Sequence, residues 1–169
     1  MELKRNGFIA LLAGVLAVSL AGCAESRSYA IPDEVCGRDM PSSELAALLP
    51  SGENFKAELV IDDEVNSACQ MRVDGSLKVS LTEYRDQNRI DVMGQIAELH
   101  PGGRPMRSEV GYETATAENA LTSMNPCRSG KFYTLHLVLS GADSDHREAL
   151  EEFADSYIPV GLKSMGCVK

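Results

Sequence analysis

Hydrophobic and polar residues alternate with a period of two in two stretches of the chain, 55–62 and 132–140. This period is typical of a β-strand that buries one face, because successive side chains point to opposite sides of a sheet. In the first stretch the apolar side contains Phe55, Ala57, Leu59 and Ile61. In the second it contains Tyr133, Leu135, Leu137 and Leu139. We therefore predict two strands, each with one face in a hydrophobic core.

Residues 69–84 predict a β-hairpin that turns at Asp74-Gly75, a dipeptide common in tight turns. A two-residue turn, however, would place Met71 opposite Lys78 and so put an apolar and a charged side chain on one face. A three-residue or bulged turn avoids this conflict. We therefore expect these cross-strand pairs: Val73 with Leu77, Met71 with Val79 and Cys69 with Leu81.

Three stretches show the spacing of amphipathic helices. The first lies in 42–49, with Ser42 or Ser43 as its N-cap, and the second runs over 86–99. The third begins near Asp145, which can cap it with Glu148 three residues on. A second hairpin is expected from 119–124 and 132–140, whereas 106–116 is ambiguous. Hairpins grouped between helices favour an α+β fold, here an antiparallel sheet of about five strands with three helices packed on it.

The first residues have the order of a secretory signal: Lys4 and Arg5, an apolar run over 8–18, then small residues over 19–22. Leu20-Ala21-Gly22-Cys23 resembles the bacterial lipobox, in which the Cys thiol receives a diacylglycerol and the chain is cut before it. We therefore expect a lipoprotein signal peptide over 1–22, a lipidated tether without fixed structure over 23–32, and a single α+β domain over 33–169. The alternative is ordinary secretion with Cys23 as a spare thiol.

The charge of the chain limits its partners. Removal of the signal takes away Glu2, Lys4 and Arg5, which changes the formal net charge from −9 to −10. Such a domain is repelled by nucleic acid and by anionic lipid headgroups, so we expect no nucleic-acid partner. The acidic surplus serves solubility or forms a patch that binds a cationic partner, and the sequence leaves both explanations open.

Four cysteines remain in the exported part, Cys36, Cys69, Cys127 and Cys167. An even number of thiols outside the cytoplasm is typical of disulfides, and their spacing does not match the usual zinc sites. Followed through the predicted elements, the chain returns to the level of Cys36 when it reaches Cys69. The final helix likewise brings Cys167 back to the level of Cys127. We therefore predict the disulfides Cys36–Cys69 and Cys127–Cys167.

Several features together resemble a group of small actinobacterial secreted lipoproteins of unknown function. These are VCG at 35–37, LLPSGE at 48–53, Cys69 at the start of a hairpin, NPC at 125–127 before an FYTL strand, and Cys167 after the last helix. The resemblance covers nearly the whole mature chain and implies export and disulfides. It implies no activity or ligand, because that group has none established.

The sequence offers few residues for catalysis. It has three histidines, His100, His136 and His146, and only His136 lies within a predicted strand. The nucleophile elbow, the HExxH zinc motif, the phosphate-binding glycine loop and the CxxC pair are all absent. The acidic stretches 62–64 and 143–145 could offer oxygens to calcium, but Asp and Ser are also the residues that turns and helix starts use. We expect no cofactor and no metal.

Two hypotheses for function follow. The first is a non-enzymatic binding or accessory module on the extracytoplasmic face of the cell membrane, anchored by the lipid on Cys23, which binds an envelope protein or a cell-wall ligand. The second is an envelope hydrolase with an unrecognised site near His136. An enzyme would show His136 in a cleft with a carboxylate and a nucleophile in hydrogen-bond reach. We favour the binding module.

Overall fold

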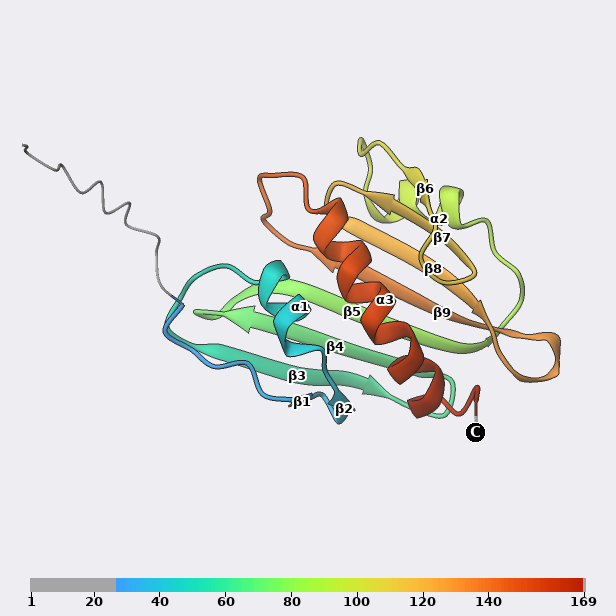
Figure 1. Cartoon of the computed structure of the whole chain (residues 1–169), viewed down its shortest axis with the longest axis horizontal. Coiled ribbons are helices and arrows are strands. Elements are labelled where there is room, and N and C mark those ends of the chain that lie inside the picture. The colour runs from blue at the N-terminus through green and yellow to red at the C-terminus, as the bar shows by residue number, and fades with distance from the viewer. Residues whose placement is uncertain (1–26, 169) are drawn as a thin grey trace, which may run out of the picture.

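A computed structural model describes residues 27–168 of the chain and shows an antiparallel sheet crossed by helices (Figure 1). The seven strands of the sheet have the spatial order β3-β4-β5-β9-β8-β7-β6. Their bounds are β3 (Phe55–Asp62), β4 (Asn66–Val73), β5 (Ser76–Gln87), β6 (Met106–Ser108), β7 (Glu113–Ala117), β8 (Ala120–Pro126) and β9 (Phe132–Leu139). A separate two-stranded hairpin pairs β1 (Glu34–Val35) with β2 (Arg38–Asp39). A short 3-10 turn, η1 (Arg128–Gly130), precedes β9.

The helices cover the two faces of the sheet unequally. Two helices, α1 (Ser42–Leu48) and α3 (Arg147–Ser164), contact each other over one face, and α3 crosses the strands obliquely (Figure 1). The largest core lies beneath them, where Leu81, Leu137 and Phe153 are fully or almost fully buried. The third helix, α2 (Val92–Leu99), packs on β7 and β8 from the opposite face. The outer face over β3, β4 and β5 has no helix on it among the described residues.

The predicted fold class is confirmed, but the predicted number of strands is wrong. The sheet has seven strands instead of about five, and β1 and β2 add a small second sheet. The missed strands β6 and β7 lie in the stretch 106–116 and just after it, where no period stands out. Strands of two or three residues such as β1, β2 and β6 are too short to show one.

The second helix starts later than expected. Residues up to Gln87 continue β5, and α2 begins at Val92, where the carboxylate of Asp91 accepts a hydrogen bond from the backbone N–H of Met93. Its buried residues are Val92 and Ile96. The expected range 86–99 therefore began too early, because residues 86–91 precede the helix.

The helix caps also differ from the prediction. Ser42 and Ser43 lie inside α1, which begins after Pro41 without a side-chain cap. Asp145 does accept a hydrogen bond from the backbone N–H of Arg147 at 3.0 Å, but the N-cap position of α3 is His146. The observed N-caps, Pro41 and His146, thus lie within two residues of the predicted ones.

The β4–β5 hairpin combines features of both turns considered above. Its turn is the tight one, with Val73 opposite Ser76 and left-handed backbone at Asp74 and Gly75 (φ 49° and 79°). A bulge between the Met71 and Arg72 pairings then shifts the register. The pairs Met71–Val79 and Cys69–Leu81 are therefore confirmed, whereas the expected Val73–Leu77 pair is wrong. The bulge keeps the apolar side chains on one face.

The described part of the expected tether, residues 27–32, is not free of structure. The Arg27 guanidinium donates hydrogen bonds to the carbonyls of Ala46 and Leu49 at the end of α1. The Tyr29 hydroxyl donates to the Pro50 carbonyl at 2.6 Å, and its ring stacks on Phe55. The expectation of no fixed structure is wrong here, because Arg27 and Tyr29 satisfy carbonyls that the helix end leaves open.

Two disulfides join segments that are distant in the sequence. They join Cys36 to Cys69 and Cys127 to Cys167, which are the pairs expected from the topology. The sequence separations are 33 and 40 residues. On the chain-entropy model each closure contributes about 4 kcal/mol to the free energy of unfolding. One disulfide holds the β1–β2 hairpin, and the other holds the segment that follows α3.

A carboxylate lies inside the core beneath α3. Glu83 on β5 is fully buried and accepts a hydrogen bond from the Tyr133 hydroxyl at 2.9 Å. Its other oxygen lies 3.4 Å from Nε of Arg38 on the β1–β2 hairpin. Gly161 of α3 passes directly above, where a Cβ would come within 2.1 Å of the Tyr133 hydroxyl. The close approach of helix and sheet at this point therefore requires glycine.

Removal of Arg38 should destabilise the fold because it leaves Glu83 buried without a counter-charge. We expect Arg38→Met to lower the free energy of unfolding by about 3 kcal/mol in urea titrations. The double variant Arg38→Met/Glu83→Gln should recover part of this loss, since it has no buried charge. A single variant as stable as the parent, or a double variant no better than the single, would contradict this account.

The tyrosines around Glu83 give the fold a stability limit at high pH. Burial, and then the charge of Glu83, raises the pKa of Tyr133 and of Tyr157 above the usual value of 10.0. Because the folded pKa exceeds the unfolded one, this stabilisation is complete below pH 10 and is lost as the pH rises above it. We expect these two of the five tyrosines to ionise only as circular dichroism reports unfolding. Full tyrosinate absorbance from an intact fold would contradict this.

Candidate functional site

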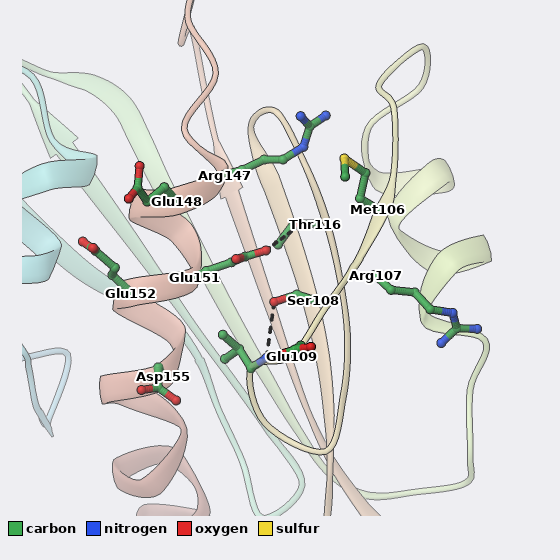
Figure 2. A pocket seen from close by; sticks show the side chains of 11 residues that line it. Met106, Arg107, Ser108, Glu109, Thr116, Arg147, Glu148, Glu151, Glu152 and Asp155 are labelled. Carbon is green, nitrogen blue, oxygen red and sulfur yellow. Dashed lines mark hydrogen bonds between the residues drawn. The ribbon is translucent and has the colours of Figure 1, made fainter.

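A groove of about 700 Å³ lies between α3 and β6. Its walls come from the first half of α3, from β6 and the loop after it, and from Thr116 on β7 (Figure 2). β6 is an edge strand of the sheet, so this side of the groove is open to solvent. The groove therefore depends on where the short strand β6 runs, which the sequence pattern did not predict.

The groove is strongly acidic. Five of its seven charged residues are carboxylates, and four of these lie on α3: Glu148, Glu151, Glu152 and Asp155. Because 3.6 residues make a turn, these positions follow one side of the helix over two turns, a length of ~10 Å. Glu151 points into the gap and accepts a hydrogen bond from the Thr116 hydroxyl at 2.9 Å, while Glu148, Glu152 and Asp155 lie on the outer side of the helix (Figure 2).

The two arginines of the groove do not neutralise it. Arg147 forms ion pairs with Glu118 and Asp145 at 2.9 Å each, and Arg107 lies 3.7 Å from Glu113. Hydrogen bonds from the backbone N–H of Arg104 and from its side chain, together with the charge of Arg147, lower the pKa of Glu118 to about 2. Glu118 therefore stays ionised at neutral pH and keeps Arg147 occupied. In the described residues, Glu109, Glu148, Glu152 and Asp155 have no basic partner.

The structure does not bring a catalytic arrangement together at His136. Its Nδ1 lies 2.9 Å from the hydroxyl of Thr122, and its ring meets Tyr84 edge to face. Thr122 is fully buried, so its hydroxyl cannot reach a substrate. Burial lowers the pKa of His136 to about 4, which leaves the imidazole neutral at physiological pH. Within residues 27–168 no carboxylate contacts it, so the arrangement expected of a hydrolase is missing there.

The other two histidines are surface residues. Nε2 of His100 lies 4.0 Å from a carboxylate oxygen of Glu118. Nε2 of His146 lies 2.9 Å from the Ser144 hydroxyl in the loop before α3. His146 and Ser144 line a pocket of about 240 Å³ together with Ser140 and Asp143.

The acidic stretches considered for calcium serve local structure. Asp63 accepts hydrogen bonds from the backbone N–H groups of Val65 and Asn66, and these bonds lower its pKa. Asp145 supports the start of α3 and pairs with Arg147. Over the part of the chain that the structure describes, no three His, Cys, Asp or Glu side chains converge to hold a metal ion.

Other predicted residues are placed as follows. Cys23, the predicted lipid attachment site, lies outside the described residues, as does the signal segment 1–22. The cysteines Cys36, Cys69, Cys127 and Cys167 are all in disulfides. The helical carboxylates of the groove were visible in the sequence only as the polar face of an amphipathic helix.

Comparisons with known proteins add no relative. No described helix is both long and apolar enough to cross a membrane. No family model, no curated protein and no solved structure matches the chain.

Proposed function

We propose that this protein is a lipid-anchored module of the bacterial envelope that binds a cationic partner without catalysing a reaction. The observation that carries the proposal is the groove along α3, whose outer carboxylates have no basic partner in the described residues. A cationic segment laid along α3 would supply the missing counter-charges. The predicted net charge of −10 after removal of the signal would also attract such a partner from a distance.

The lipid anchor is supported by the sequence around Cys23. The charged start, the short apolar run and the small residues before the cysteine follow the order of a lipoprotein signal. Two acyl chains bury many CH₂ groups at ~0.8 kcal/mol each, which is enough for stable attachment without a protein span. The two disulfides agree with an oxidising location outside the cytoplasm.

The absence of a catalytic role is supported by the surroundings of His136. The partners of His136 are the buried Thr122 hydroxyl and the Tyr84 ring. Neither partner gives His136 a nucleophile that a substrate could reach. The groove, in turn, offers carboxylates that are spread along a helix instead of facing one another across a scissile bond. Spread charges suit recognition of an extended ligand better than acid–base chemistry at one point.

Cys23 should be required for membrane attachment. We expect the parent protein to partition into the detergent phase of a cell extract and Cys23→Ala to move to the aqueous phase, because the thioether to the lipid can no longer form. Ser26→Ala serves as a control that leaves the thiol in place and should partition like the parent. If Cys23→Ala stayed in the detergent phase, the proposed anchor would be wrong.

Charge reversal on α3 should weaken binding of a cationic probe. With an oligolysine peptide at low salt, we expect Glu148→Lys/Glu152→Lys to bind about tenfold or more weakly than the parent in calorimetric titrations. Added salt should weaken the parent complex, because exposed charges are screened.

The matched control places the same change elsewhere. Asp62→Lys/Glu64→Lys alters the net charge by the same amount at exposed positions at the end of β3 and just after it. β3 is the edge strand opposite β6, so these positions lie away from the groove. This variant should retain most of the affinity. An equal loss in both variants would show that oligolysine responds to net charge alone and that the groove is not the binding site.

A further inference from the structure

A second, smaller pocket lies on the opposite face of the sheet from α3. It occupies about 170 Å³ at the border between the open outer face and α2. Its lining residues come from β5, the loop before α2, α2 itself and β9: Tyr84, Gln87, Ile90, Gln95, Thr134 and His136. At about 30 Å³ per water in the liquid, this is the space of five or six water molecules. The pocket is therefore large enough for one small ring.

The lining of this pocket carries hydrogen-bonding groups but no formal charge, although the chain as a whole is strongly acidic. Two amides, a phenol, an imidazole and a hydroxyl face an isoleucine. The low pKa of His136, about 4, keeps its ring neutral at physiological pH. Its Nδ1 is occupied by the Thr122 hydroxyl, so Nε2 remains for a further partner.

One lining residue has a polar group that the protein leaves unsatisfied. Thr134 is 1% exposed, and its hydroxyl has no hydrogen-bond partner among the described residues. Buried hydroxyl groups without partners are uncommon, because burial removes their bonds to water. An isosteric valine would avoid this cost at the same position. The hydroxyl is explained if a bound molecule supplies its partner after a small side-chain movement.

We propose that this pocket binds a neutral sugar unit. Amide, hydroxyl and imidazole groups match the alternating donors and acceptors of a polyhydroxylated ring, and Tyr84 and Ile90 match its apolar C–H faces. An ion finds no counter-charge there, and a wholly apolar ligand would offer no hydrogen bond to the five polar side chains. The site is distinct from the acidic groove, which lies on the face covered by α3.

The surface beside the pocket would accommodate a chain of such units. Thr82 lies opposite His136 on β5, and Ala68 lies opposite Thr82 on β4. Ser80, two residues before Thr82 on β5, points to the same outer face. These side chains are small or polar, so a glycan could continue from the pocket across β5 and β4 without a steric barrier from a helix.

The test is a titration of the protein with glucose, mannose, galactose and N-acetylglucosamine, followed by amide NMR shifts. We expect saturable shifts with at least one sugar, confined to β5, β9 and α2. Gln95→Ala should lower the affinity about three- to tenfold, the effect of one lost hydrogen bond. Gln70→Ala, the same change on the same outer face but outside the pocket, should leave the affinity unchanged.

Thr134→Val separates ligand binding from stability. If the hydroxyl is kept for a ligand, this variant should be at least as stable as the parent in urea titrations and should bind the sugar more weakly. The absence of saturable shifts with all four sugars would overturn the proposal. An equal loss of affinity in Gln95→Ala and Gln70→Ala, or undiminished binding by Thr134→Val, would also overturn it.

Discussion

The buried carboxylate of Glu83 is the constraint on which the helical face of the molecule depends. Arg38 must stay beside it, and the Cys36–Cys69 disulfide holds the hairpin that carries Arg38. Gly161 must pass above it, and the Cys127–Cys167 disulfide fixes the chain soon after α3 ends. Each covalent link thus secures one of the elements that close over the charge. The two disulfides therefore protect a polar cluster as well as restricting the unfolded chain.

The unequal covering of the sheet separates two kinds of surface. On one face, α3 buries its apolar side and presents its carboxylates to solvent beside β6. On the other, α2 covers β7 and β8 and leaves the outer side of β3, β4 and β5 open. Charge is concentrated on the first surface, whereas neutral polar groups line the pocket on the second. One small domain can therefore offer a charged groove and an uncharged pocket on opposite faces of its sheet.

Periodicity predicted the features that depend on neighbours in the chain, such as the buried face of β9, the stripe of α3 and the approximate hairpins. For β3 the predicted buried face is wrong at Leu59 and Ile61, which are exposed, and the pairing with β4 shifts register between them. It missed β6 because three residues show no period, and the groove is built on that strand. It also gave no sign that Glu83 would be buried, because the partner Arg38 lies 45 residues earlier in the sequence and is brought there by a hairpin. The surroundings of His136 depend on the register of β8 against β9, which pairs it with Thr122.

The docking of Arg27 and Tyr29 at the end of α1 has a consequence for orientation. Only four peptide steps separate Arg27 from Cys23, a reach of no more than ~14 Å when fully extended. The backbone N–H of Ser28 donates to the Gly52 carbonyl, and that of Asp74, in the β4–β5 turn, donates to the Asn54 carbonyl. The segment that starts at Arg27 therefore lies beside the β4–β5 turn. If Cys23 is lipidated, the sheet stands on this end above the bilayer. The opposite end of the sheet, with the β8–β9 turn, then points away from the bilayer (Figure 1).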